Sequence, residues 1–292
     1  MAIPSSFVFD VPHLREKTVR AGLLARAAAI FRVDEILIYP PSPKANSQER
    51  EFLKKILSYL ETPQYLRKMI FPLSPDMQYV GVLPPLRTPH HPVLGASKQR
   101  STSYREGIVI GSEKQWVTVD VGLEKKVRIK AHNLDRGRRV TIRIEKGSQG
   151  DRFSVVSREE VPVYWGYDVL VSEKTLGEIL KDRRNELIIM TSRYGKPIPD
   201  GIKELKKELS TTSRILVVFG SPQEGISEIL ARERLRPYDF TKIVLNTIPS
   251  QGTETVRTEE AVYATLAILN ALEGGLEGNL KMNAETTNGG LR

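Results

Sequence analysis

The sequence has no cysteine, only four histidines, and no apolar run long enough to span a bilayer. The missing cysteine excludes disulfides, thiolate metal sites and a cysteine nucleophile, and it suits a reducing cytoplasm. His13, His90, His91 and His132 do not have the spacing of a zinc site, so we expect no metal. The first residues lack the basic and apolar segments of a secretory signal. We therefore expect a cytoplasmic protein without a membrane partner.

Positive charge is the strongest bias in the composition. The 292 residues carry a net charge of +9, and 40% of them are hydrophobic, enough for one large domain or two smaller ones. Residues 87–160 hold 16 lysines and arginines against nine acidic residues, a net charge of +7. This concentration favours a nucleic acid partner, although solubility alone also accounts for a basic surface.

Apolar strands and helices alternate in the N-terminal part of the chain. We expect a strand at Ser5–Val11, a helix at Leu14–Phe31, a buried strand at Asp34–Tyr39 and a helix at Ser47–Leu60. Alternation of this kind predicts an α/β fold with a parallel sheet.

The same alternation returns in the C-terminal part. Buried strands are expected at Leu187–Thr191, Ile215–Phe219 and Ile243–Leu245, with a helix at Pro199–Leu209 and a last helix at Thr258–Leu272. The two α/β segments therefore lie on either side of a region with a different pattern.

That region reads as five short β-strands between Arg105 and Val156, separated by glycines. The pattern predicts a small antiparallel barrel, an OB-fold or a close relative. Tyr104, Trp116 and Phe153 are candidates for stacking on RNA bases. The alternative is that rings such as Trp116 and Phe153 fill the barrel core, which is the commoner role for a single aromatic side chain.

The barrel is thus expected to interrupt the α/β domain. We assign residues 1–86 and 161–275 to a discontinuous α/β domain and residues 87–160 to an inserted, RNA-binding barrel. The last residues, 276–292, are rich in Gly, Asn and Thr, and we expect a flexible tail there.

Three consecutive C-terminal strands end in polar loops that contain glycine: TSRYG, FGSPQEGIS and NTIPSQGTETVRT. In open α/β sheets, ligands bind beyond the carboxyl ends of the strands, and glycine lets the backbone approach them closely. None of the loops is a phosphate-binding Walker A or GxGxxG sequence. The loops therefore predict backbone recognition of an adenosine-type cofactor.

The last two loops, with the VRTEEA segment (256–261) and the segment Arg15–Tyr39, resemble motifs of the SPOUT-class, trefoil-knotted RNA methyltransferases. The similarity is closest to the archaeal and eukaryotic subgroup with a small barrel inserted in the knotted domain, and it covers residues 5–272. It implies S-adenosylmethionine as cofactor, a deep knot formed by the three loops, and a homodimer. It also suggests ribosomal RNA as substrate, with uridine N3 as the methylated atom.

The resemblance assigns cofactor contacts to positions in each of the three loops. These are Thr191, Ser192, Arg193, Gly195, Phe219, Gly220, Ser221, Asn246, Thr247, Ile248, Gly252, Val256 and Thr258. Two motifs depart from the family pattern. The second loop is one residue longer than usual, and the residues from Thr255 to Thr258 replace the usual Ser-Leu-Asn, so only the backbone role carries over.

Charged residues near the loops are candidates for catalysis. Arg257, Arg20 and Arg26 are suited to stabilising negative charge on a base, and Glu259 and Glu224 are candidate proton acceptors. Arg257 and Glu259 serve equally well to complement the start of the last helix. Arg20 and Arg26 lie on an amphipathic helix, where arginines are more often solvated.

The function expected from these observations is S-adenosylmethionine-dependent methylation of an RNA base nitrogen. The alternative is a non-catalytic RNA-binding factor of ribosome assembly that retains the knotted fold. A doubly wound nucleotide-dependent enzyme is the weakest reading, because no phosphate-binding loop is present.

Overall fold

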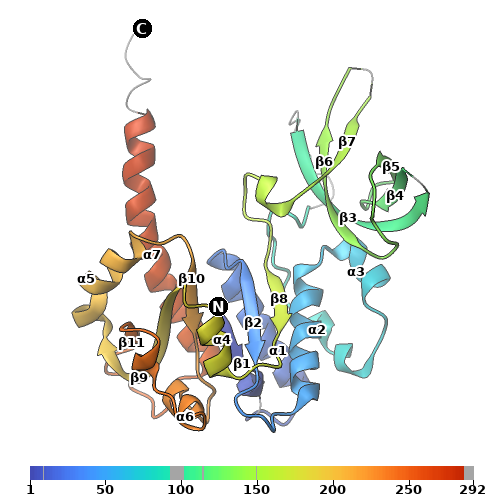
Figure 1. Cartoon of the computed structure of the whole chain (residues 1–292). Helices are drawn as coiled ribbons and strands as arrows, with labels where there is room; N and C mark the ends of the chain where they lie inside the picture. The colour runs from blue at the N-terminus through green and yellow to red at the C-terminus, as the bar shows by residue number, and fades with distance from the viewer. Residues whose placement is uncertain (9, 93–101, 114, 149, 286–292) are drawn as a thin grey trace. The chain divides into compact units, whose positions relative to one another are not determined.

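A six-stranded parallel sheet organises the larger part of the chain (Figure 1). The computed structural model describes residues 1–8, 10–92, 102–113, 115–148 and 150–285. The chain divides into unit 1, Met1–Ile56 with Asp168–Arg292, and unit 2, Leu57–Tyr167. The strand order in unit 1 is β11 (Val244–Asn246), β9 (Leu187–Pro197), β10 (Ile215–Val218), β1 (Ala2–Pro4), β2 (Glu35–Tyr39) and β8 (Asp168–Val171).

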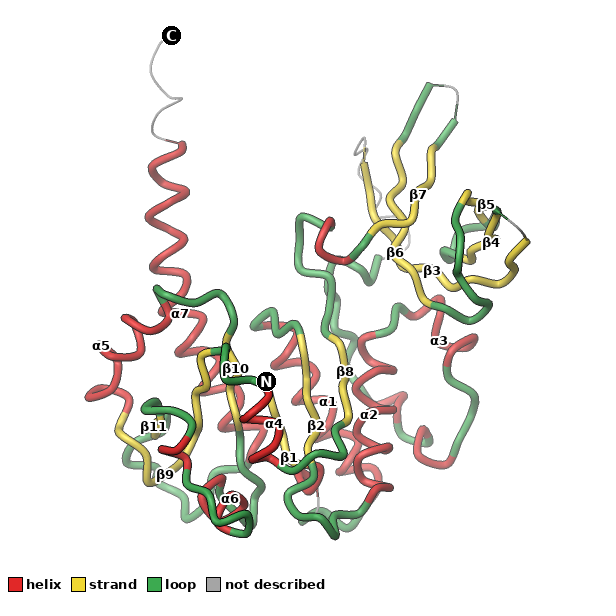
Figure 2. Tube along the Cα trace, viewed as in Figure 1, coloured by secondary structure: helices red, strands yellow, loops and turns green. Residues whose placement is uncertain are grey.

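Helices alternate with these strands, as the sequence predicted (Figure 2). They are α1 (Leu14–Ile30), α2 (Ser47–Glu61), α4 (Leu176–Asp182), α5 (Ile198–Leu209), α6 (Ile226–Ala231) and α7 (Thr258–Glu285). The helix α7 therefore continues past residue 276, where the expected tail begins, and residues 286–292 lie outside the described residues.

The prediction of a strand at Ser5–Val11 is wrong. The strand is β1, Ala2–Pro4, and Ser5–Val8 form a 3-10 helix. Pairing decides the outcome: Ala2 and Ile3 are fully buried, and β1 lies between β10 and β2 with Ala2 opposite Val218 and Leu37. Three residues suffice for this central position because both of their neighbours are already strands.

The pairing register between β9 and β11 shifts within the ladder. Val244 pairs with Met190, but the next residue of β11, Leu245, pairs with Lys196. Residues 191–195 therefore have no partner in this ladder and form a bulge within β9. A side chain on Gly195 would place its Cβ 2.7 Å from the carbonyl carbon of Leu245, so only glycine fits at this contact.

Unit 2 contains the five antiparallel strands that the sequence predicted. Their order is β5 (Val127–Lys130), β4 (Trp116–Asp120), β3 (Thr102–Glu113), β6 (Arg139–Glu145) and β7 (Arg152–Val156). The two outer strands of this order, β5 and β7, also contact each other, which brings the sheet close to a closed barrel. The fold class is thus confirmed: a parallel α/β unit and a separate barrel-like β-sheet. Unit 2 also includes α3 (Gln64–Ile70).

The aromatic residues of the barrel strands differ in how far they are buried. Alternate residues of each strand point inward, including Val117 and Val119 of β4 and Ile129 of β5, and Phe153 packs against this apolar cluster. Trp116 is 42% exposed and therefore lies outside the core. Tyr104 of β3 is half-buried beside Arg143 and Trp165, so Trp116 is the most exposed of the three aromatic candidates.

A buried polar network supports unit 2. The carboxylate of Glu61 accepts two hydrogen bonds from the guanidinium of Arg139, whose Nε donates to Glu106 at 2.5 Å. Glu106 also accepts hydrogen bonds from Thr141 and from the indole of Trp165. Both carboxylates are almost fully buried, so each depends on these donors for the interactions that water would otherwise provide.

The network determines the ionisation of Glu61. Burial alone would raise the pKa of this carboxyl, but Arg139 and His90 outweigh burial and hold the pKa at about 2. Because this pKa is lower in the folded state than in the unfolded chain, the charged carboxylate stabilises the fold above about pH 4.5. That stability is lost as the pH falls from there towards 2.

We predict that Glu61→Gln lowers the free energy of unfolding on the order of 3 kcal/mol at pH 7, since Arg139 loses its charged partner. The loss should be smaller at pH 3, because the carboxyl of the unfolded chain is then largely protonated and must release its proton on folding. Urea unfolding followed by tryptophan fluorescence measures it, because Trp116 and Trp165 both lie in unit 2. Glu124→Gln, at an exposed position of this unit, should change little. An equal loss at both pH values would contradict the linkage.

Candidate active site

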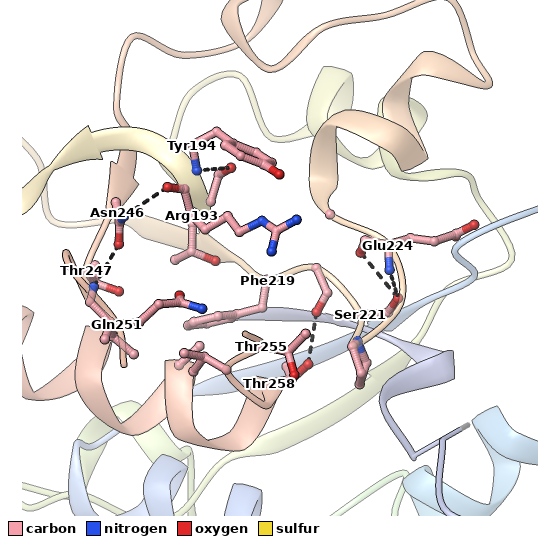
Figure 3. Close-up of a pocket in the computed structure, with 18 of the residues that line it drawn as sticks. Arg193, Tyr194, Phe219, Ser221, Glu224, Asn246, Thr247, Gln251, Thr255 and Thr258 are labelled. Carbon is pink, nitrogen blue, oxygen red and sulfur yellow. Dashed lines mark hydrogen bonds between the residues drawn. The ribbon is translucent and has the colours of Figure 1, made fainter. Parts of the chain in front are cut away.

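Three loops of unit 1 enclose a pocket of about 310 Å³ (Figure 3). Two of them follow the strands β10 and β11, and the first is the bulge at residues 191–195 of β9, the strand between them. They therefore meet on one side of the sheet, as ligand-binding loops of open α/β sheets do. The lining residues are Thr191, Ser192, Arg193, Tyr194, Phe219, Gly220, Ser221, Pro222, Gln223, Glu224, Gly225, Glu228, Leu245, Asn246, Thr247, Ile248, Gln251, Thr255, Val256, Thr258 and Ala261.

The first loop is the bulge of β9, residues 191–195. Thr191 Oγ1 donates to the carbonyl of Val218 on β10, at 3.1 Å. The side chain of Arg193 donates to the carbonyl of Glu254 in the third loop, at 3.3 Å. These bonds attach the first loop to its two neighbours.

The second loop folds back on itself after β10. The backbone N–H of Ser221 donates to the carbonyl of Glu224 at 2.8 Å, and the N–H of Glu224 donates to Ser221 Oγ at 2.9 Å. A Cβ on Gly220 would lie 2.9 Å from the Glu224 carbonyl oxygen, so a glycine is required for this tight turn. The extra residue of this motif is thus accommodated within a hydrogen-bonded turn.

The third loop connects β11 to α7. Asn246 uses both ends of its amide: Nδ2 donates to the carbonyl of Arg193 at 2.9 Å, and Oδ1 accepts from the N–H of Ile248 at 3.0 Å. Thr258, at the start of α7, donates to the carbonyl of Gly220 at 3.1 Å. Asn246 and Thr258 therefore join the third loop to the first and second loops.

The chemistry of the lining is mostly neutral. Backbone groups, hydroxyls and amides alternate with apolar side chains such as Ile248 and Val256. The charged lining residues are Arg193, Glu224 and Glu228, and Glu224 forms an ion pair with Arg232. Such a lining suits a planar ring with polar edges and a positively charged group better than a row of phosphates, which needs several cations or a helix start rich in free N–H groups.

The structure brings together all the residues to which the sequence assigned cofactor contacts, except two glycines. Gly195 is used in the contact between β9 and β11, and Gly252 is exposed, with no atom within 4 Å of an added Cβ. Sequence reasoning missed several lining residues. Tyr194 and Gln251 lie in two of the polar loops that the sequence singled out, so their positions alone could have suggested a contact with the ligand. Glu228 lies on α6, and only the fold shows that it reaches the pocket.

Two of the catalytic candidates bond to each other. Arg20 on α1 and Glu259 on α7 form a bidentate ion pair, with Nε to Oε1 at 2.8 Å and Nη2 to Oε2 at 3.3 Å. The side chain of Asp10 accepts a further bond from Arg20 at 2.6 Å. Arg20 and Glu259 are 6% and 3% exposed, and neither lines the pocket. In this structure their interaction joins two helices.

The other two candidates also lie outside the pocket lining. Arg257 is exposed, and its backbone N–H donates to the carboxylate of Glu260 at 2.9 Å, which is the helix-capping role that the sequence left open. Arg26 lies on α1 near Tyr263 of α7, where burial raises the pKa of the phenol and the charge of Arg26 opposes that shift.

A parallel α/β unit with a loop-built pocket at its strand ends is the arrangement of an enzyme that holds a small molecule at that edge. Residues 1–269 match the family model described as "Putative RNA methyltransferase". The chain belongs to this family of RNA methyltransferases. Its reaction is therefore the transfer of a methyl group from a donor to RNA.

Relatives are found in archaea and in animals. A human protein named 28S rRNA (uridine-N(3))-methyltransferase is 34% identical, over 94% of this chain and 78% of its own length. The mouse protein of the same name is 33% identical, over 94% and 76%. An uncharacterised protein of Haloarcula marismortui is 33% identical, over 93% of this chain and 98% of its own length.

No cluster of three or more His, Asp or Glu side chains with the geometry of a metal site occurs among the described residues. Within the same residues, no helix is long and apolar enough to cross a membrane.

We predict that Glu259→Gln costs about 3 kcal/mol of stability, because it leaves the buried guanidinium of Arg20 with Asp10 as its single carboxylate partner. Thermal unfolding measures the loss. Glu260→Gln, which alters only an exposed cap of the same helix, should cost about 1 kcal/mol or less. A Glu259→Gln protein that unfolds like the wild type but transfers no methyl group would instead support a catalytic carboxylate.

Proposed function

We propose that this enzyme transfers the methyl group of S-adenosylmethionine to N3 of a uridine in ribosomal RNA. The observation that carries the proposal is the pocket of three interlocked loops in a chain of this methyltransferase family. The printed names of the human and mouse relatives supply the base and the class of RNA. An intact pocket argues against a non-catalytic assembly factor, which would have no need to maintain it.

The residues present fit this cofactor. Apolar side chains of the third loop and of β11, such as Leu245 and Ile248, offer a surface for the adenine ring, and backbone and hydroxyl groups offer partners for its edge and for the ribose. The carboxylates of Glu224 and Glu228 suit the positive charges of the sulfonium and the amino group.

When bound, the cofactor supplies a methyl group already activated on a sulfonium. The protein must then hold the uridine edge in line with that methyl group, exclude water and receive the N3 proton. Of the two proton acceptors suggested from the sequence, both form an ion pair with an arginine, but Glu224 lines the pocket and Glu259 does not. We therefore favour Glu224 for the proton.

We further propose a homodimer that pairs through α1, with the knot that the family resemblance implies. The helix exposes Val19, Leu23 and Ile30, which are 40%, 40% and 48% exposed. Their spacing of four and seven residues places them on one face of the helix, and Arg26 falls between them on the same face. An apolar stripe with one cation suits a second copy of the same surface.

The RNA partner is proposed to reach unit 2 as well. Trp116 of β4 stands opposite Lys130 of β5 in the register, and the guanidinium of Arg128 lies 5.4 Å from the indole centroid. An exposed indole with two neighbouring cations is the combination that binds unpaired nucleotides, through stacking and phosphate contacts.

The cofactor proposal predicts that the purified protein binds S-adenosylmethionine with micromolar affinity by calorimetry, like many cofactor sites. Gly220→Ala should weaken binding at least about tenfold, because its Cβ displaces the turn at Glu224. Gly81→Ala is the matched control, since its Cβ meets no atom within 4 Å.

Mass spectrometry of nucleosides from ribosomal RNA, with and without the gene, then tests the base. Loss of 3-methyluridine is the expected result. A folded protein that binds RNA but not the cofactor, and leaves every nucleoside unchanged, would favour the assembly factor.

For unit 2, we predict that Trp116→Ala weakens binding of a uridine-rich single-stranded RNA about tenfold at fixed salt, the cost of one lost stacking contact. Fluorescence anisotropy measures the affinity. Leu123→Ala removes an apolar side chain of the same unit with the same 42% exposure, so it should leave the affinity within about twofold. Equal losses in the two variants would reject the stacking role.

A further inference from the structure

Tyr194 is an aromatic residue of the pocket lining that remains largely exposed. Its side chain is 77% exposed, although it belongs to the first loop and borders the cavity (Figure 3). A phenol ring left in water forgoes the stabilisation that burial would provide. Its position at the mouth of the site therefore calls for an explanation other than packing.

The loop that carries Tyr194 is held in place by hydrogen bonds. The N–H of Tyr194 donates to Ser192 Oγ at 3.2 Å. The carbonyl of Arg193 accepts from Asn246, and the side chain of Arg193 donates to the carbonyl of Glu254. The backbone beneath the ring is thus fixed to the third loop, and the exposure of the ring is a property of the bonded loop.

The ring itself is oriented by its neighbour. The guanidinium carbon of Arg193 lies 4.7 Å from the ring centroid of Tyr194, a cation–π contact. With Arg193 on one face and most of the side chain exposed, the ring can accept a second planar group without rearrangement. Arg193 is also the one cation among the described residues that line the pocket.

We propose that Tyr194 is the platform on which the target uridine stacks, with the guanidinium of Arg193 holding the ring from its opposite face. The inference rests on the proposed function and specifies how its substrate is held. An enzyme that modifies a base edge must take the base out of the helix or bind it unpaired, and stacking on an aromatic ring replaces the lost neighbours.

Arg193 fixes the platform before the base arrives. Its guanidinium carbon lies over one face of the Tyr194 ring, 4.7 Å from the centroid, and its Nη1 donates to the carbonyl of Glu254 at 3.3 Å. The uridine stacks on the other face, so the ring keeps its position when the base binds.

The test uses a ten-nucleotide RNA of cytidines with one 5-iodouridine, irradiated with the full-length protein and mapped by mass spectrometry. We expect the adduct at Tyr194. Tyr194→Ala should lower the total adduct of the first loop about tenfold, the scale of one stacking contact, while Tyr194→Phe, which keeps the ring, stays within about twofold. The matched control is Tyr238→Ala, since Tyr238 is 67% exposed in unit 1 and does not line the pocket.

The remaining outcomes separate this inference from its premise. Equal adducts at Tyr194 and Tyr238, or a Tyr194→Phe loss as large as that of Tyr194→Ala, would overturn the platform. The platform would also be overturned if ultracentrifugation showed that Tyr194→Ala dissociates the proposed dimer while Tyr238→Ala does not. The ring would then contact a second copy of the chain. Calorimetry with S-adenosylmethionine on the same samples tests the proposed function separately. If the protein forms the adduct but does not bind the cofactor, the proposed function is contradicted and the platform is not. If it binds the cofactor but forms no adduct at Tyr194, the platform is contradicted and the proposed function is not.

Discussion

The close contact between β9 and β11 at Gly195 is the constraint on which the pocket depends. Because a Cβ at this position would collide with the backbone of Leu245, the absence of a side chain lets β11 pair with the far part of β9 while residues 191–195 loop out. The side chain of Asn246 then donates a hydrogen bond to the carbonyl of Arg193 within residues 191–195. The geometry of the site thus follows from one backbone approach and a few hydrogen bonds to main-chain groups.

Charged residues in this protein have two separate roles. Buried pairs such as Arg20 with Glu259 and Glu61 with Arg139 join elements that are far apart in the sequence, and each charge there depends on its partner. The pocket lining, in contrast, is mostly neutral, with Arg193 at its mouth. A charged residue beside the pocket therefore need not face the ligand, since Arg20 and Glu259 pair with each other between two helices.

Prediction succeeded where the signal was local. The alternation of apolar residues and glycines indicated the barrel strands, and the polar loops after apolar strands indicated nearly the whole pocket lining. It failed where pairing partners decide. Ala2–Pro4 became a strand because β2 and β10 flank it, and the inward or outward direction of Trp116 depended on a register that periodicity alone left open. The partner of Arg20 is 239 residues away in the chain.

The sequence by itself determined the order of elements, the inserted basic barrel and the three loops, since each is written in neighbouring residues. The tertiary structure decided which side chains share the site. It assigned Glu259 to an ion pair, Gly195 to a strand contact, and Glu228 and Tyr194 to the pocket. The physical reason is that a side chain's environment depends on the elements packed against it, and those elements come from distant parts of the chain.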